Sequence, residues 1–499
     1  MVLALDGVSR DQLYAMLRAG ELPNLAALVG GDGFSHAYFD DSFLSVLPST
    51  TMAAWVSAFT GATPAEHGVA GNEYFVRETK RFESPSPVSF KDRNPTLALY
   101  DEEYLDTLYR TPNVYERMRA KDRDILIWVS MSPIFRGADE MLFTKRDYVA
   151  SAAANLLEQT TRGYYADMDS SALDALSDHL ETGTLPDVLT VYLPGIDLDA
   201  HLAPEGPDRA RRAYLREVVD PPLGKVVRRL RDRGLLDRLW VIVTSDHGHT
   251  AVLHDAAHSL GTNDGPRELL THAGFRVRGF AHEVPREDPF NAVLAYGGAI
   301  AYVYLADRSL CPGVGGPCSW QQPPRYEQDV LAAADAFYRA NLDGTLAPQM
   351  KGTLDMVLTR VPKPAAEIDA PFEVYIGDGK TVPIDEYLAD HPHPTYVRFA
   401  ERMYELAVGP RGERAGDVVL IAHNGDRERI ADRFYFARLY HSWHGSPSRR
   451  DSEIPLIVAN RHHDAKTIGT WVRAQLGAEP LAEKLTDLML GLRDGALGQ

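Results

Sequence analysis

Short apolar runs typical of β-strands alternate along this chain with longer, charge-rich stretches typical of helices. Asn113–Lys121 predicts a helix that leads into the strand Ile125–Val129, and Asp208–Arg233 predicts a long helix before the strand Leu239–Thr244. Strands that alternate with helices form a mostly parallel sheet. The sequence therefore predicts an α/β fold in which helices sandwich such a sheet.

The alternation weakens after Gly279, and 499 residues are too many for one ordinary hydrophobic core. We expect residues 1–279 and 411–499 to form the core and residues 280–410 to form an inserted smaller lobe. Helices are expected in this lobe near Val330–Asn341 and Tyr396–Leu406. Core elements are expected to resume with the strands Gly416–Ala422 and Ile454–Val458 and to close with the helix Leu481–Leu492.

Acidic residues stand where three of the apolar strands end. Asp6, Asp197 and Asp246 each follow such a run, and His201 and His247 accompany two of them. Parallel α/β sheets bind ligands beyond the carboxyl ends of their strands, so these carboxylates are expected to converge. Imidazole and carboxylate groups suit Zn²⁺. The pattern predicts a centre of two metal ions.

Some residues compete for these roles. Asp199 would point to the opposite side from His201 if the strand continued through it, so Asp197 is the expected ligand. The remaining histidines are interpreted as solvated, supporting or structural groups. Of these, His249 is the one most expected to contribute to the site. They are His249, His254, His258, His391, His393, His441, His462 and His463.

Hydroxyl side chains cluster at an expected helix start, in Pro48-Ser49-Thr50-Thr51. Such side chains usually cap the helix, which is our interpretation of Ser49 and Thr50. Thr51 is the candidate nucleophile. A base or a metal ion can remove its proton, and a helix N-terminus favours an oxyanion and an incoming anionic group.

The charge and composition of the chain limit the kinds of molecule that it is expected to bind. The net charge of −18 argues against a surface that binds a nucleic-acid duplex. A small anionic ligand would need local positive charge, which metal ions supply. The longest uncharged apolar stretch, Ala292–Ala306, is interrupted by Gly297-Gly298 and is too short to cross a membrane. We expect two strands around a tight turn there and no transmembrane segment.

The cysteines and the N-terminus bear on the compartment. Cys311 and Cys318 bracket a flexible Pro- and Gly-rich segment, which predicts either a small disulfide loop or two unpaired thiols. Met1 begins inside the first strand. The expectation is a periplasmic or secreted protein if an upstream leader is missing from this sequence, and a cytoplasmic one otherwise. The oligomeric state is left open.

Six motifs follow one another along the chain: Asp6-Gly7, Pro48–Gly61, His67–Asn72, Asp197–His201, Ser245–Gly248 and His444-Gly445. In order and spacing they resemble the type I phosphodiesterase/nucleotide pyrophosphatase family of the alkaline phosphatase superfamily. The similarity extends to Gly416–Ala422 and the closing helix, but not to residues 280–410. The resemblance implies an alkaline phosphatase-like α/β fold and a metal-dependent hydrolase.

The resemblance also implies roles for residues. One Zn²⁺ would be held by Asp197, His201 and His444, and the other by Asp6, Asp246, His247 and the oxygen of Thr51. Mn²⁺ or iron is the alternative metal. Thr51 would attack phosphorus, and Asn72 would donate its amide to a phosphoryl oxygen. Two ions about 4 Å apart can stabilise the attacking and leaving oxygens together.

The implied activity is a two-metal phosphoesterase that hydrolyses phosphodiester or pyrophosphate bonds through a covalent phosphothreonine intermediate. Its substrate would be a small phosphate ester, with nucleotides as candidates. The pocket is left open, because Ala200 and Met52-Ala53-Ala54 depart from the family pattern. We expect the 280–410 lobe and segments near Tyr74-Phe75 and Trp128–Arg136 to shape it, their aromatic rings either packing or supporting a base.

Other activities remain as alternatives. Monoester-specialised relatives place a Lys-x-Arg pair between the asparagine and the Asp-x-x-x-His, but here Ile134 stands two residues before Arg136, with Lys145 or Arg146 as other sources of charge. A diester preference is therefore expected. Alternatives are a phosphomonoesterase of alkaline phosphatase type and a phosphonate hydrolase. A phosphoglycerate mutase-like enzyme and a non-catalytic zinc-binding protein are less favoured.

Overall fold

The larger sheet positions the predicted site. A computed structural model of the chain describes residues 1–89, 95–142, 161–181, 184–280, 289–311, 318–362 and 371–495. In these residues seven strands follow the order β2-β17-β8-β1-β7-β5-β6. Strands β8 to β6 are parallel, and β17 is antiparallel to both its neighbours. The predicted mostly parallel sheet is confirmed. Its strands are β1 (Val2–Leu5), β2 (Ala37–Asp40), β5 (Ile127–Ser130), β6 (Glu140–Met141), β7 (Val188–Leu193), β8 (Val241–Ser245) and β17 (Leu456–Ala459).

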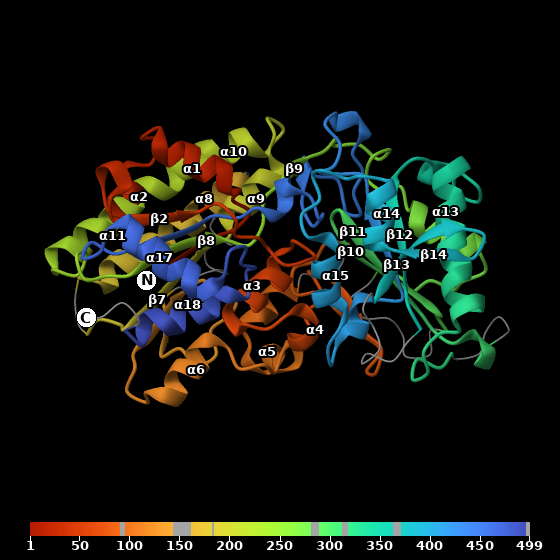
Figure 1. Cartoon of the computed structure of the whole chain (residues 1–499), viewed down its shortest axis with the longest axis horizontal. Helices are drawn as coiled ribbons and strands as arrows, with labels where there is room; N and C mark the ends of the chain where they lie inside the picture. Colours follow the sequence, from red (N-terminus) through yellow and green to blue (C-terminus); the bar gives the residue numbers. More distant parts are fainter. Residues whose placement is uncertain are drawn as a thin grey trace.

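Helices cover both faces of this sheet (Figure 1). Leu3 and Leu5 of β1 belong to the core beneath one set of helices, and Val2 and Ala4 to the core beneath the other. Successive side chains of a strand point to opposite faces, so an entirely apolar β1 serves both cores. The first set is α1 (Arg10–Arg18), α2 (Pro23–Leu28), α8 (Thr161–His179) and α11 (Asp220–Asp232); the second is α3 (Thr51–Thr60), α6 (Val114–Lys121), α17 (Ala465–Leu476) and α18 (Lys484–Arg493).

The long helix predicted over 208–233 is continuous but irregular. It consists of α10 (Pro207–Tyr214), the π-helical turn η3 (Leu215–Val219) and α11. Pro221 and Pro222 follow the turn. Proline has no backbone N–H to donate to the preceding turn, which is a physical reason for the irregular hydrogen bonding there.

A second, antiparallel sheet lies beside the first. Its described strands follow the order β10-β11-β15-β12-β13-β14. The expected pair of strands around Gly297-Gly298 is present as the hairpin β10–β11. The bounds are β10 (Ala292–Gly297), β11 (Ile300–Leu305), β12 (Leu354–Arg360), β13 (Phe372–Gly377), β14 (Lys380–Pro383) and β15 (Val418–Ala422), with helices α13 (Leu331–Asp343), α14 (Ile384–Asp390) and α15 (Phe399–Ala407).

One strand is not where the sequence placed it. We expected 416–422 to return to the core sheet, but β15 lies between β11 and β12 of the second sheet. All five residues of β15 are buried, and a strand buried on both faces has the same apolar pattern in either sheet. The division of the chain at residues 280 and 410 stays a prediction.

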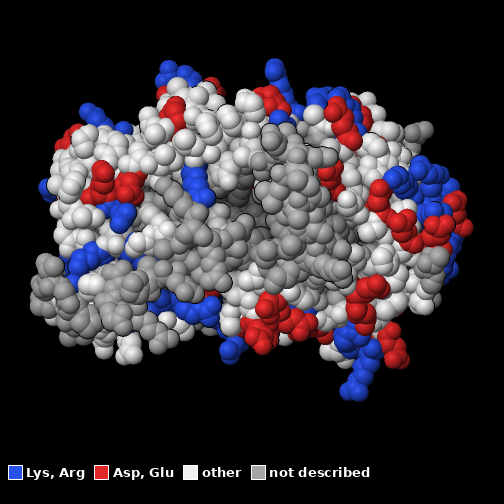
Figure 2. All heavy atoms as spheres, turned by 180° about the vertical axis from the view of Figure 1, so that it is seen from behind, with Lys and Arg blue, Asp and Glu red and all other residues white. Residues whose placement is uncertain are grey.

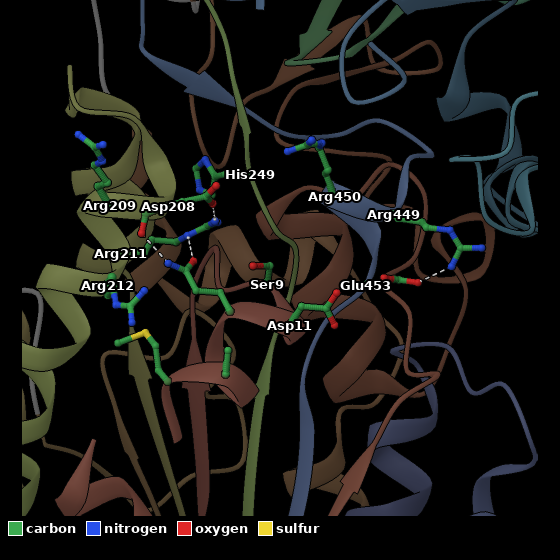
Figure 3. A pocket seen from close by; sticks show the side chains of 13 residues that line it. Ser9, Asp11, Asp208, Arg209, Arg211, Arg212, His249, Arg449, Arg450 and Glu453 are labelled. Carbon is green, nitrogen blue, oxygen red and sulfur yellow. Dashed lines mark hydrogen bonds and ion pairs between the residues drawn. The ribbon is translucent and has the colours of Figure 1, made fainter. Parts of the chain in front are cut away.

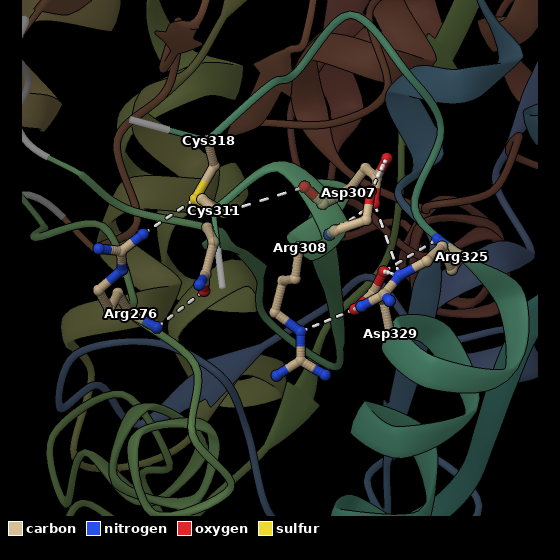
Figure 4. The surroundings of a disulfide bond; sticks show 9 residues. Arg276, Asp307, Arg308, Cys311, Cys318, Arg325 and Asp329 are labelled. Atoms are coloured by element: carbon tan, nitrogen blue, oxygen red, sulfur yellow. Dashed lines mark hydrogen bonds and ion pairs between the residues drawn. A yellow bond between two sulfur atoms is a disulfide. The ribbon is translucent and has the colours of Figure 1, made fainter. Parts of the chain in front are cut away.

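Of the two alternatives for the cysteines, the disulfide is present. Cys311 and Cys318 are bonded, with Arg276 beside the sulfur of Cys318 (Figure 4). On the outer surface, acidic and basic side chains are interspersed over the face shown in Figure 2. Among the helices that the structure describes, none combines the length and apolar character that crossing a membrane requires.

Candidate metal centre

Three neighbouring strands deliver the predicted carboxylates. Strands β8, β1 and β7 are adjacent and parallel, with Leu5 opposite both Ser245 and Leu193. Asp6 and Asp246 directly follow β1 and β8. Three chain segments that are distant in sequence therefore end side by side at one edge of the sheet.

Asp197 and His201 reach the site from a helix rather than from an extended strand. After β7 the chain enters α9 (Gly195–Leu202), where residues four apart share a face. Asp199 lies on another face and pairs with Arg162, at 2.5 Å and 2.9 Å. The choice of Asp197 over Asp199 agrees with this geometry, although its premise of a continuing strand was wrong.

The first predicted donor set is gathered in the structure. Asp197, His201 and His444 each offer a ligand atom, all within 4.8 Å of one another. His201 Nε2 lies 3.4 Å from Oδ2 of Asp197, and His444 Nε2 lies 3.8 Å from its Oδ1. Donor atoms placed tetrahedrally about 2.0–2.1 Å from Zn²⁺ lie roughly 3.3 Å apart. The spacing therefore suits one such ion.

The second set is gathered beside it. His247 Nε2 lies 3.5 Å from Oδ1 of Asp6, 3.3 Å from Oδ2 of Asp246 and 3.2 Å from Oγ1 of Thr51. The rings of His247 and His444 stack with centroids 3.5 Å apart. Each set contributes one of these two rings, so the two sets adjoin.

Backbone carbonyls orient the three imidazoles. Nδ1 of His201 lies 2.6 Å from the carbonyl oxygen of Ser442. Nδ1 of His247 lies 3.0 Å from the carbonyl oxygen of Gly248, and Nδ1 of His444 lies 2.9 Å from that of Ser49. A carbonyl oxygen only accepts, so each Nδ1 carries a proton, and Nε2 is the nitrogen that would offer the lone pair of the neutral ring. Burial also lowers the pKa of His201 and of His444, which keeps both rings neutral.

The buried carboxyl groups of Asp6 and Asp246 lie close together in an arrangement that favours a bound cation. Among the described residues, Oδ1 of Asp6 and Oδ2 of Asp246 are buried without a hydrogen-bond partner. Both face Nε2 of His247, at 3.5 Å and 3.3 Å. Burial raises the pKa of Asp6, and the charges of Asp246 and Asp197 raise it further; burial also raises the pKa of Asp246. Buried acceptors that lack protons are costly unless a positive ion compensates them.

The candidate nucleophile lies at the start of a helix, as predicted. Thr51 is the first residue of α3, and Thr50 at the N-cap makes no side-chain capping bond. The hydroxyl of Ser49 instead lies near Val46, Ser446 and Ser452. Capping therefore explains neither Ser49 nor Thr50.

Asn72 is held against the same helix start. Its Oδ1 accepts from the backbone N–H of Met52, at 3.0 Å. This bond fixes the amide, so its nitrogen is the end that remains to donate to a ligand. The arrangement is compatible with the role expected of Asn72.

The turn of the hairpin β10–β11 supports His444. The N–H of Ala299 donates to the carbonyl of His444, at 2.9 Å. A Cβ on Gly298 would lie 2.3 Å from that carbonyl, and one on Gly445 would lie 2.3 Å from the carbonyl of Gly297. Both glycines have positive φ. Their lack of side chains therefore permits this close approach of the second sheet to the site.

Two contributors were missed or underrated in the sequence. His249 Nε2 lies 2.7 Å from Oδ1 of Asp197, and its Nδ1 lies 3.1 Å from Oγ of Ser442. Tyr192 donates to Oδ2 of Asp6. The position of His249, two residues after a predicted ligand, was a usable signal. No sequence signal marked Tyr192, because its position within the apolar run of β7 is typical of a core residue.

The expected pocket aromatics are packing residues. Tyr74 and Phe75 are buried, and the ring of Phe75 contacts Phe290, Tyr304 and Trp320. Trp128 is also buried. In the residues that the structure describes, these rings are therefore not exposed platforms for a base.

Arg136 is occupied elsewhere. Its guanidinium donates to Asp106 at 2.7 Å and to Glu116 at 3.2 Å, and it lies over the ring of Tyr109. Its charge is thus neutralised by two carboxylates. Lys145 and Arg146, the other expected sources of charge, lie outside the described residues.

His249 also lines a cavity of about 590 Å³ between α1, α10 and α16 (Arg449–Ser452) (Figure 3). Arg211, fully buried there, donates to the carbonyl of Gly7 at 2.8 Å. Neither Thr51 nor Asn72 is among the lining residues. This cavity therefore does not present the candidate nucleophile to a ligand.

Comparisons with known proteins give the family of this chain. The family model described as type I phosphodiesterase / nucleotide pyrophosphatase matches residues 1–306. A protein of Schizosaccharomyces pombe described as an uncharacterized pyrophosphatase/phosphodiesterase is 26% identical over 264 residues, which are 50% of this chain and 44% of that protein. The chain thus spans less than half the length of this curated relative.

Two matches to solved structures cover nearly the whole chain. Murine ectonucleotide pyrophosphatase/phosphodiesterase 5 matches with 12% identity and a TM-score of 0.49. An inactive form of it in complex with AMP matches with 11% identity and a TM-score of 0.50. Each match covers 99% of this chain and 94% of the other. The second supports the alkaline phosphatase-like fold.

Proposed function

This chain belongs to the type I phosphodiesterase/nucleotide pyrophosphatase family, and from that premise we propose that it is a two-metal phosphoesterase acting through a covalent phosphothreonine intermediate. Its proposed substrates contain a phosphodiester or pyrophosphate bond. The observation that carries the proposal is the position of Thr51, whose hydroxyl stands 3.2 Å from His247 within the second of two adjoining donor sets.

The proposed metal ligands are Asp197, His201 and His444 for one ion and Asp6, Asp246, His247 and Thr51 for the other. Zn²⁺ suits this mixture of imidazole and carboxylate, with Mn²⁺ or iron as alternatives. When bound, two such ions supply Lewis acidity and neutralise charge on the reacting oxygens. Arg136, an expected source of positive charge, is instead paired with Asp106 and Glu116.

The reaction proceeds in two displacements. Thr51 releases its hydroxyl proton to solvent, Oγ1 forms a bond to phosphorus, and the bond from phosphorus to the leaving oxygen breaks; the leaving group takes a proton from solvent. Water then attacks phosphorus, the bond to Oγ1 breaks, and Thr51 regains a proton. Asn72 donates its amide to a non-bridging oxygen, and α3 directs its N-terminus towards the charge on Thr51.

Nucleotides are the proposed substrate class. The family description names nucleotide pyrophosphatases, and one similar structure holds AMP. We propose that the lobe 280–410 shapes the pocket, since the hairpin β10–β11 of the second sheet already contacts His444. A phosphomonoesterase of alkaline phosphatase type and a phosphonate hydrolase remain the competing activities.

Metal removal tests the proposal directly. Purified protein is assayed with an aryl phosphodiester and a dinucleoside pyrophosphate before chelation, after chelation and after Zn²⁺ is restored, while bound metal is counted. We expect activity to disappear and return together with two ions from the catalytic sets. Activity that persists in metal-free protein would contradict the proposal. His247→Gln, which removes one ligand, should require more metal for the same rate.

A further inference from the structure

A second cluster of histidine and carboxylate side chains lies outside the catalytic residues. Asp355, His393 and Asp426 each offer one ligand atom, and these atoms lie within 4.8 Å of one another. His423 joins them, with Nδ1 3.6 Å from Oδ1 of Asp355 and 3.1 Å from Oδ2 of Asp426. The residues come from three segments: strand β12, the chain before α15, and the turn after β15.

A β-bulge directs Asp355 into the cluster. Leu354 and Met356 stand opposite the adjacent residues Ala422 and Ile421, so Asp355 is the extra residue between them. A bulge of this kind re-aims the side chain it carries. The side chain of Asp355 is only 4% exposed, and burial raises the pKa of its carboxyl. The negative charge of Asp355 is therefore opposed by desolvation.

Tyr396 holds two members of the cluster. Its hydroxyl donates to Oδ2 of Asp355 at 2.6 Å, and its ring stacks on that of His393 with centroids 4.7 Å apart. Oδ1 of Asp355 is then the oxygen that faces His393 Nε2, at 3.4 Å. This spacing resembles the 3.3–3.5 Å between carboxylate oxygens and His247 in the catalytic centre.

Arg427 is the cation that an ion would have to displace. Its Nε lies 3.1 Å from Oδ2 of Asp426, and its nitrogens lie 3.0 Å and 2.8 Å from the two ring nitrogens of His423. The lone-pair directions of Nδ1 and Nε2 diverge, so one guanidinium that approaches both lies against the ring rather than on either lone pair. Its side chain is 43% exposed, which leaves it room to turn towards solvent.

We propose that Asp355, His393, His423 and Asp426 bind a third divalent transition-metal ion, separate from the catalytic pair, with Zn²⁺ as the preferred ion. Two imidazoles with two carboxylates suit Zn²⁺, whereas Ca²⁺ takes oxygen ligands. Tyr396 also forms a β-bridge with Ser448, four residues after His444. The ion therefore fastens the second sheet to the segment that carries a catalytic ligand.

The test counts Zn²⁺ per chain by elemental analysis, after equilibration with Zn²⁺ and removal of free metal. Wild type is compared with Asp355→Asn and His393→Gln. His391→Gln is the matched control, because it alters the same His-Pro-His-Pro segment but stacks on Tyr387 outside the cluster. Both cluster variants should bind one ion fewer than wild type, and the control should bind the same number. Tyr396→Phe should weaken binding of that ion by about 10- to 100-fold.

The comparison between variants is independent of the catalytic centre. Loss of one ion with phosphodiesterase activity retained at saturating Zn²⁺ supports a third site. Equal ion counts in wild type and both variants overturn it, as does an equal loss in His391→Gln. If Asp355→Asn fails to fold, His393→Gln decides the matter, because its side chain is 17% exposed. A failed chelation test of the catalytic proposal would leave this difference in count unchanged.

Discussion

Nε2 of His249 lies 2.7 Å from Oδ1 of Asp197, an oxygen that also faces His444 at 3.8 Å. The other ring nitrogen of His249 is 3.1 Å from Oγ of Ser442. His249 directly precedes strand β9 (Thr250–Ala251), and Ser442 belongs to β16 (Ser442–Trp443), the strand that pairs with β9. One imidazole thus connects this strand pair to a carboxylate of the metal centre. We expect His249 to position Asp197.

Replacing this ring should weaken metal binding. In His249→Phe the bond to Asp197 is lost, so the carboxylate is less well oriented, and we expect the metal concentration for half-maximal activity to rise about 10- to 100-fold. The maximal rate should fall much less. Activity is measured against free Zn²⁺, with the exposed His254→Gln as control. An unchanged metal requirement would show that His249 does not position Asp197.

Thr51→Ala should lower turnover by a factor on the order of 10³ or more, because the nucleophile of a covalent mechanism is lost. Thr51→Ser should keep a measurable fraction of the rate. Thr50→Val is the matched control, since the hydroxyl of Thr50 is buried without a hydrogen-bond partner in the described structure. Steady-state rates at saturating Zn²⁺ give the comparison, and a near-normal rate in Thr51→Ala would exclude covalent catalysis through this residue.

Diesters should be hydrolysed more efficiently than monoesters. A monoester carries an additional negative charge, while Ile134 is fully buried and Arg136 is paired with Asp106 and Glu116. We expect kcat/KM for an aryl diester to exceed that of the monoester with the same leaving group by about tenfold or more. A preference for the monoester of roughly a hundredfold would mean that positive charge reaches the pocket from another part of the chain.

Stability should depend on pH through Asp169. This buried carboxyl accepts from the N–H of Gly195, at the start of α9, and from Tyr214. Burial raises its pKa to about 8, above its value in an unfolded chain of about 3.9. Its stabilising contribution is therefore full below about pH 4 and is lost as the pH rises through about 8.

Asp169→Asn removes this titration. The urea midpoint of the variant should improve relative to wild type as the pH rises from 5 to about 8, because over this range only wild type must hold a proton on a buried carboxyl that ionises in the unfolded chain. Asp174→Asn on the same helix is the control; its carboxylate is solvent-exposed and pairs with Lys225. Parallel pH profiles for wild type and Asp169→Asn would contradict the raised pKa.

The residues of the candidate site could be predicted from the sequence because their signals are local. Asp6 and Asp246 stand directly after apolar strands, and Asp197 follows the apolar run of β7 with His201 four residues later. The strands themselves follow from apolar runs of strand length. These features depend on neighbours within a few positions, so no tertiary information is needed to recognise them.

Tertiary structure decided how those residues are used. The carbonyl of Ser49 orients His444, and that of Ser442 orients His201, although each pair is separated by more than two hundred residues. Distant residues also determine which sheet contains β15 and why Phe75 is buried. The same holds for the pairing of Arg136 with Asp106. An apolar run or a lone arginine has the same local pattern in either setting, and only the contacts made on folding distinguish them.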